Sequence, residues 1–139
     1  MTSETAPPGP DAALCPCGSA QPYGRCCGRF HRGEAQAATA EQLMRSRYAA
    51  FAREDAAYLL ATWHPSSRPR RVRFDPARRW VGLEVLATSG GGMLDDEGTV
   101  SFVAHHERDG EHRELREVSA FVRVDGRWCY LGPVDAALG

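Results

Sequence analysis

The sequence predicts an α+β fold, in which an N-terminal metal-binding knuckle precedes helices packed on one face of a curved antiparallel sheet. Three observations predict it: four of the five cysteines fall within residues 15–27, apolar residues then recur at helical spacing, and the period changes to two in the C-terminal half. Helices followed by a run of strands with short turns are typical of an α+β layout.

The chain has 139 residues, enough for one compact domain with a small appendage. Hydrophobic residues make up 42% and charged residues 25%, ordinary globular proportions that disfavour a disordered chain. No stretch approaches the roughly 20 apolar residues of a membrane helix, and the first 13 residues lack the basic start and apolar core of an export signal. We therefore expect a cytoplasmic protein with no membrane contact.

Two helices are expected before the strands. Thr39 and Gln42 have capping-box spacing and begin an amphipathic helix through Arg53. Its apolar stripe consists of Leu43, Met44, Tyr48 and Phe51. Asp55 can cap a second, shorter helix, which should end near His64 because a proline follows.

Four strands are expected after an arginine-rich loop. They cover residues 80–89, 99–108, 115–124 and 127–131. Glycines at 90–92 and the pairs Asp109-Gly110 and Asp125-Gly126 mark the turns, which predict an antiparallel meander. We expect three segments: a flexible leader at 1–13, the knuckle at 14–33 and the α+β domain at 34–139.

The four clustered cysteines, Cys15, Cys17, Cys26 and Cys27, predict a structural metal site. Cysteines in a chain without an export signal are expected to be reduced, which favours metal binding over disulfides. Four thiolates suit tetrahedral zinc, and the same set can hold iron. A reduced loop without metal, or an oxidised pair, is the alternative. The fifth cysteine, Cys129, is expected to pack within a strand.

Residues around the knuckle suggest a docking patch. We expect Tyr23, Arg25, Arg29 and Phe30 to be exposed and to contact a protein or RNA partner. His31 follows Cys27 by four residues and is a substitute ligand, ranked below the cysteines because such a histidine is usually solvated.

The segment CPCGSAQPYGRCC resembles the SEC-C motif, found in the protein-translocation ATPase SecA and in small bacterial proteins, and its ligands map onto the four cysteines. Beyond it, the chain resembles the YchJ family over residues 43–65, 79–86, 98–104 and 117–132. The resemblance implies the cone-shaped fold of the nuclear transport factor 2 superfamily, which commonly encloses a pocket. The chain ends without the second, C-terminal SEC-C knuckle of many relatives, and His106 stands where the family pattern has an aromatic residue.

The implied cone-shaped fold would enclose a pocket between the helices and the sheet. We expect its lining to include Arg47, Tyr48, Trp63 and Ser119. His64 and Glu117 are the candidates for an acid–base pair. Against catalysis, Arg47 and Glu117 can form a structural ion pair, His64 can simply end its helix, and the aromatic residues can be core.

Other charged residues suggest further partners. Six arginines between Arg68 and Arg79, with Phe74 among them and Trp80 next, are suited to phosphates and stacked bases, which suggests RNA. A solvated loop is the alternative, and the net charge of −1 argues against a dedicated nucleic-acid binder. His105, His106 and His112 lie in or near a hairpin, and strand alternation places the first two on opposite faces, so we expect no second metal site there.

The leading functional hypothesis is a zinc-knuckle adaptor that docks on a macromolecular partner, with the ribosome or the protein-export machinery as candidates. The alternative is a small-molecule-binding protein, or a lyase- or isomerase-like enzyme, that uses the cone cavity. Dimerisation is common for this fold, and a homodimer is a further expectation.

Overall fold

The computed structural model describes residues 10–134, which form short helices and one four-stranded sheet. The helical elements are η1 (Pro10–Ala12), η2 (Tyr23–Arg25), α1 (Cys27–His31), α2 (Ala40–Ala52) and α3 (Ala56–Ala61). The strands are β1 (Arg78–Gly90), β2 (Glu97–Arg108), β3 (Glu111–Val124) and β4 (Arg127–Pro133). Among these helices, none is long and apolar enough to cross a membrane.

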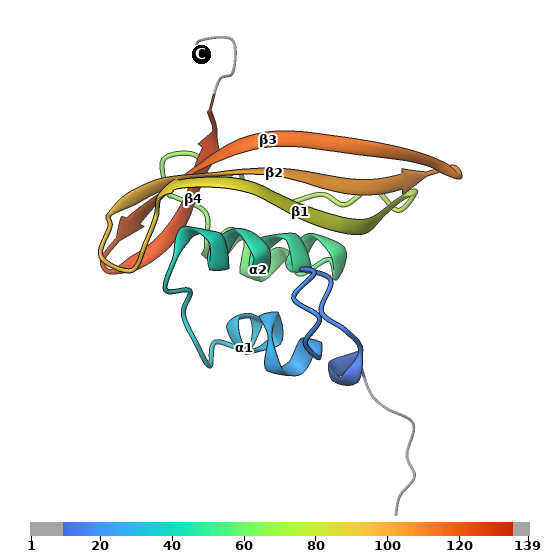
Figure 1. The fold of residues 1–139 in the computed structure, drawn as a ribbon, viewed down its shortest axis with the longest axis horizontal. Coiled ribbons are helices and arrows are strands. Elements are labelled where there is room, and N and C mark those ends of the chain that lie inside the picture. Colours follow the sequence, from blue (N-terminus) through green and yellow to red (C-terminus); the bar gives the residue numbers. More distant parts are fainter. Residues whose placement is uncertain (1–9, 135–139) are drawn as a thin grey trace, which may run out of the picture.

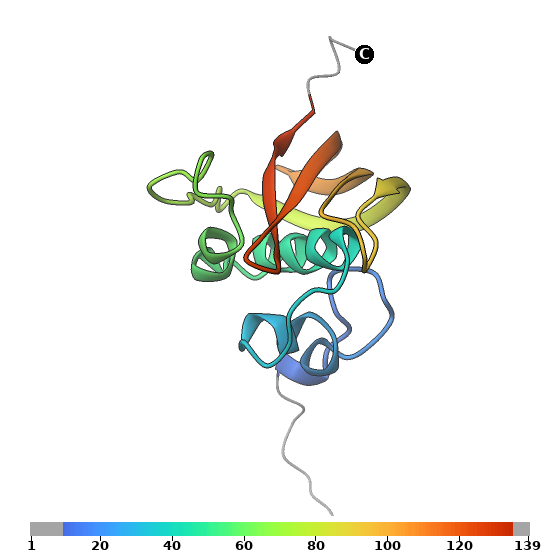
Figure 2. The ribbon, with the colours of Figure 1, turned by 90° about the vertical axis from the view of Figure 1, so that its left-hand side faces the viewer.

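The elements are arranged in layers. Figure 1 shows the curved sheet above α2 and the segment that contains η1, η2 and α1 below α2. Figure 2, turned by 90°, shows α3 beside α2 under the same sheet. Helix α2 is therefore covered on two sides, and eight of its 13 residues are buried, including the polar Ser46 and Arg47.

The helix starts follow the predicted capping. Thr39 Oγ1 accepts a hydrogen bond from the Gln42 backbone N–H at 3.1 Å. The Gln42 side chain reaches back one residue further than in a standard capping box and accepts from the Ala38 N–H at 2.8 Å. Asp55 Oδ1 accepts from the Tyr58 N–H at 3.1 Å and caps α3.

Helix α3 ends at Ala61, before the predicted end near His64. The reason is pairing with β4: Trp63 forms a parallel bridge with Tyr130, and the His64 N–H donates to the Tyr130 carbonyl at 2.8 Å. These residues leave the helix to satisfy backbone groups at the sheet edge.

The sheet is the predicted antiparallel meander, in the order β1-β2-β3-β4. Asp109 and Gly110 both have positive φ, as do Asp125 and Gly126, which matches the two-residue turns that suit hairpin twist. The first of these turns lets pairing begin at Arg108 opposite Glu111, so β3 starts earlier than predicted.

The main core lies between α2 and the concave face of the sheet. Its buried members are Ala40, Leu43, Met44, Tyr48, Val100, Phe102, Ala104, Phe121 and Trp128. Trp128 Nε1 also donates to the Ala38 carbonyl at 3.1 Å, which fixes the segment leading into α2. His106, placed where an aromatic residue was expected, is buried with its ring 5.1 Å from that of Trp80, so it packs as an aromatic side chain.

Candidate functional site

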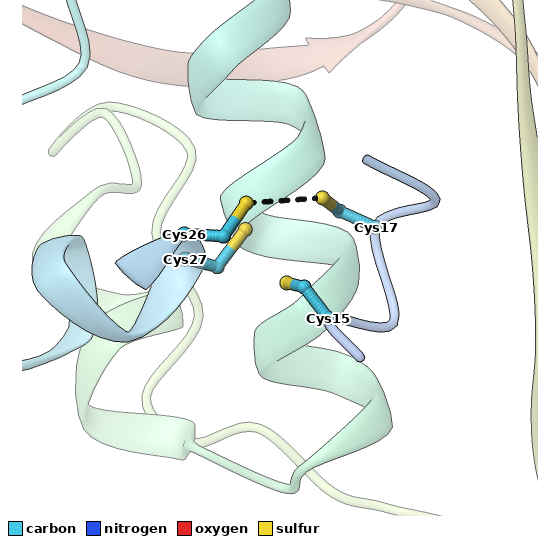
Figure 3. A group of neighbouring side chains, drawn as sticks. All are labelled: Cys15, Cys17, Cys26 and Cys27. Carbon is cyan, nitrogen blue, oxygen red and sulfur yellow. Dashed lines mark hydrogen bonds between the residues drawn. The ribbon is translucent and has the colours of Figure 1, made fainter. Parts of the chain in front are cut away.

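The four knuckle cysteines converge from two short segments (Figure 3). Cys15 and Cys17 lie in the loop before η2, whereas Cys26 and Cys27 lie at the start of α1. Gly18 has a φ of 85°, which lets its N–H turn back to the Cys15 carbonyl at 3.3 Å. The turn at Gly18 therefore directs Cys15 and Cys17 toward the same point as Cys26 and Cys27.

The sulfur geometry fits a single metal ion. The four Sγ atoms all lie within 4.8 Å of one another, and Cys17 and Cys26 Sγ are 3.6 Å apart. A tetrahedral zinc with Zn–S bonds of about 2.3 Å requires S–S separations of about 3.8 Å. All four are free thiols, and Cys15, Cys17 and Cys27 are buried. The cluster can therefore hold a metal ion in a closed, structural site.

Hydrogen bonds within the cluster separate the thiol pKa values. The bond between Cys15 and Cys17 lowers the pKa of Cys17 and raises the pKa of Cys15 to about 11. Hydrogen bonds to these two residues, together with burial, raise the pKa of Cys27. One thiolate with protonated neighbours is thus favoured, and a bound cation would favour loss of the remaining protons.

The expected exposure of Tyr23 and Phe30 is wrong, because both side chains are buried. The Arg53 guanidinium covers the Tyr23 ring, 3.7 Å from its centroid. Arg25 and Arg29 are exposed as expected, with Arg29 lying 5.1 Å from the Phe30 centroid. The aromatic half of the predicted patch packs within the protein because a segment this small has few other apolar side chains to bury.

The His31 side chain is neither solvated nor a member of the four-sulfur cluster. Its Nε2 donates to the Ser46 carbonyl of α2 at 2.8 Å, which leaves Nδ1 to accept from the Tyr23 hydroxyl at 2.5 Å. Tyr58 of α3 packs on the same ring at 4.6 Å and bonds to Ser46 Oγ at 2.7 Å. Burial lowers the His31 pKa, in keeping with a neutral ring.

A second candidate site is a cavity of about 280 Å³ between α2 and the sheet. The four predicted pocket residues, Arg47, Tyr48, Trp63 and Ser119, all line it. Phe102 and Phe121 line it as well, so these aromatic residues serve both core and pocket wall.

Arg47 is only 5% exposed and is fixed at this cavity. Its Nη1 donates to the Leu59 carbonyl at 2.8 Å and to Thr62 Oγ1 at 2.7 Å. The guanidinium lies 4.8 Å from the Trp63 ring centroid and 4.6 Å from that of Tyr130. Burial lowers the Arg47 pKa to about 10, so the group stays charged at neutral pH.

Glu117 lies on the sheet side of the cavity. Its Oε2 accepts from Ser119 Oγ at 2.5 Å and from the Tyr130 hydroxyl at 3.1 Å. Burial raises the pKa of Tyr130 to about 12, which keeps this hydroxyl a donor. Ser119 and Tyr130 thus orient the carboxylate.

Two predicted pairings are not formed among residues 10–134. Arg47 and Glu117 line one cavity but make no ion pair, because Arg47 is held by α3 and Glu117 by Ser119 and Tyr130. His64 lies outside the cavity lining, and its Nδ1 accepts from the Ser66 N–H at 3.0 Å, so the structure does not bring it to Glu117. Tyr130 was not among the residues that the sequence predicted for the pocket. The alternation of side-chain direction along the last strand is the sequence pattern that could have identified it.

The comparisons with known proteins agree with this architecture. The family model described as "YchJ, middle NTF2-like domain" matches residues 39–133, and the SEC-C motif model matches residues 13–29. The chain belongs to the YchJ-like family. A UPF0225 protein of Streptomyces coelicolor is 55% identical over 116 residues, covering 84% of this chain and 90% of that protein. One from Ralstonia nicotianae is 48% identical over 143 residues, covering 94% and 96%.

Two solved structures share the fold of this YchJ-like chain. The solution structure of a SEC-C motif containing protein from Rhodopseudomonas palustris is 34% identical, covers 88% of this chain and 98% of its own, and has a TM-score of 0.75. The crystal structure of a SEC-C motif containing protein from Psychrobacter arcticus is 26% identical, covers 90% and 84%, and has a TM-score of 0.74. The predicted family and fold class are confirmed.

Proposed function

We propose that this YchJ-like chain is a small-molecule-binding protein, in which a zinc-loaded knuckle supports the helix that forms one wall of the binding cavity. The observation that carries the proposal is the buried Arg47. A buried guanidinium is costly to desolvate, and a desolvated charged group that lines a pocket is a candidate for ligand binding. Here it is oriented by two hydrogen bonds and two aromatic rings at a cavity whose lining is mostly apolar.

Both charged groups keep free atoms. Among the described residues, His106 Nδ1 is the one side-chain nitrogen or oxygen atom that is both buried and without a hydrogen-bond partner. Any other such atom that lacks a partner is therefore exposed at least in part. Within residues 10–134, Arg47 Nε and Nη2 and Glu117 Oε1 have no hydrogen-bond partner, and these three atoms are therefore accessible. Because both residues line the cavity, it offers donors and an acceptor to a bound molecule.

These groups define the class of ligand. The cavity volume of about 280 Å³ lies just below the range of about 300–1,000 Å³ for small-molecule sites, which favours a compact molecule. Its aromatic wall suits an apolar ring. Three charged residues line the cavity, of which Arg78 is exposed whereas Arg47 and Glu117 are not. The opposite charges of Arg47 and Glu117 suit a zwitterion or a neutral molecule that carries both a donor and an acceptor.

The knuckle would act structurally. Its buried residues pack against Ala49 of α2, and Arg45 of α2 donates to the Cys17 carbonyl at 2.8 Å. Metal binding contributes folding free energy to a segment with a small core. Zinc, which suits four thiolates, would thus keep α2 in place over the cavity.

A cavity-filling variant tests the proposal. Indole, indole-3-acetate, tryptamine and tryptophan, which share a ring and differ in charge, are titrated by ligand-observed NMR. Ala104→Leu adds three carbons to a side chain that lines the cavity, whereas Ala87→Leu adds the same atoms at an exposed position of β1. We expect at least one probe to bind, tryptophan most strongly, and Ala104→Leu to weaken it at least tenfold. Binding of none, or equal binding by both variants, would overturn the proposal.

The second candidate function is the adaptor that docks on the ribosome or the export machinery. The observation that favours it is the exposure of Leu14, 68%, on a knuckle that also exposes Arg25 and Arg29. Charge reversal by Arg25→Glu with Arg29→Glu should abolish co-sedimentation with purified ribosomes, and Ala104→Leu should not. If neither the native protein nor any variant co-sediments, the ribosome is excluded as the partner.

A further inference from the structure

A second group of metal-ligating side chains lies on the sheet face that points away from α2. His105 of β2 pairs directly with Glu114 of β3, and His112 lies two residues before Glu114 on the same strand. Residues two apart on a strand share a face, so all three side chains lie together. His105 neighbours Ala104, which belongs to the core, and therefore occupies the opposite face.

The ligand atoms are close enough to share one ion. His105 Nδ1 lies 3.0 Å from His112 Nε2 and 3.8 Å from Glu114 Oε2. The nearest nitrogen or oxygen atoms of the three residues all lie within 4.8 Å of one another. Metal–nitrogen and metal–oxygen bonds of about 2.0–2.2 Å place neighbouring ligand atoms about 3–3.5 Å apart.

A neighbouring carboxylate already fixes the His105 ring. His105 Nε2 donates to Glu84 Oε1 of β1 at 2.6 Å. The proton therefore resides on Nε2, and the Nδ1 lone pair faces His112 and Glu114. A carboxylate on the far nitrogen is the usual partner of a metal-ligating histidine, where it sets the tautomer and raises the basicity of the ring.

We propose that His105, His112 and Glu114 form a second metal site for a divalent transition ion such as Zn²⁺ or Ni²⁺, with Glu84 as the positioning residue. Two imidazoles and a carboxylate suit these ions, whereas hard ions such as Mg²⁺ and Ca²⁺ prefer oxygen ligands alone. His112 and Glu114 are exposed, so water completes the coordination. The proposed site therefore has coordination positions open to water, whereas four protein ligands fill the coordination shell at the four-cysteine site.

The expectation that His105, His106 and His112 form no metal site rested on the opposite orientation of His105 and His106. Their opposite orientation holds, but the site draws its second histidine from the next strand. In the absence of an ion, His112 Nε2–H donates to His105 Nδ1, and that hydrogen bond holds the rings in place. An ion replaces the shared proton, which moves to the other nitrogen of His112.

Calorimetric titration with Ni²⁺ tests the proposal. The tag-free protein is first loaded with one equivalent of zinc to fill the knuckle and is then titrated near pH 7.5. We expect one Ni²⁺ per chain, lost in His112→Ala, a change at an exposed position that leaves the fold intact. Glu84→Gln should weaken binding by about 10- to 100-fold, the usual effect of removing such a partner.

The matched controls are His64→Ala, which removes a histidine elsewhere, and Glu111→Gln, which neutralises an exposed carboxylate at the same hairpin. Both should still bind one Ni²⁺ with the affinity of the native protein. The proposal is overturned if the native protein shows no saturable heat, or if His112→Ala binds Ni²⁺ as the native protein does. Neither result depends on the ligand proposed for the cavity.

Discussion

The His31 ring donates a hydrogen bond from Nε2 to the backbone oxygen of Ser46 at 2.8 Å. His31 ends the short helix of the knuckle, and Ser46 lies in the middle of α2. This bond links two segments that each have their own apolar cluster. The buried neutral imidazole of His31 therefore joins the knuckle to the cavity wall, in addition to the packing on Ala49 and the hydrogen bond from Arg45 to the Cys17 carbonyl.

Replacing His31 should destabilise the protein. His31→Ala removes bonds to Ser46 and Tyr23 and opens a void beside Tyr58, and buried losses of this kind cost about 2–4 kcal/mol. The free energy of unfolding in urea measures the loss. The matched change is His64→Ala, whose ring hydrogen-bonds within the described residues only to nearby Ser66, and it should cost less than about 1 kcal/mol. Equal losses in the two variants would contradict the linking role.

Stability should fall as pH drops below about 6.5, the ordinary histidine value. Burial lowers the pKa of His31 in the folded protein, so between that lower value and about 6.5 the unfolded chain binds the extra proton. Unfolding at pH 7 and pH 5.5, in excess zinc, should show a smaller decrease for His31→Gln than for the native protein. Part of the decrease remains in the variant because burial also lowers the pKa of His106. An identical decrease in both proteins would show that His31 does not titrate in this way.

Chelation of the metal should loosen the knuckle before the sheet. The knuckle cluster contains three buried cysteines and Tyr23, and packs on Ala49, so most of its stability would come from metal bonds. Hydrogen exchange after treatment with a chelator should show protection lost over residues 13–33 and kept in β2 and β3. Uniform loss across the chain would instead indicate one cooperative unit.

RNA binding through the loop from Arg68 to Arg79 remains a prediction with its own test. Arg70, Arg71 and Arg73 are exposed and form no ion pair within the described residues. Changing all three to Gln should reduce the slope of log affinity against log salt by about 2 for single-stranded RNA. Absence of binding by the native protein, or affinity independent of salt, would exclude this role.

Much of the fold follows from local patterns. The cap residues Thr39 and Asp55, and the turns at Gly110 and Gly126, act over a few residues, so the sequence reveals them directly. The four-cysteine cluster can also be predicted from the sequence, because it depends on residue type and spacing within one short segment.

The partners of buried polar groups were less predictable. Whether Arg47 meets Glu117 or the end of α3 depends on how α2, α3 and the sheet pack together, which local periodicity does not encode. The same holds for Tyr23 and His31, which read as surface residues because the knuckle alone has no interior. Contacts between segments decide these positions.

The central claim, that the four clustered cysteines hold a metal ion, is tested most directly by metal stoichiometry. Protein purified without affinity-tag metal and dialysed against metal-free buffer is analysed by elemental mass spectrometry, beside a variant carrying Cys26→Ser and Cys27→Ser. We predict about one zinc per chain in the native protein and none in the variant. No metal in either protein, with all thiols reduced and accessible, would contradict the account.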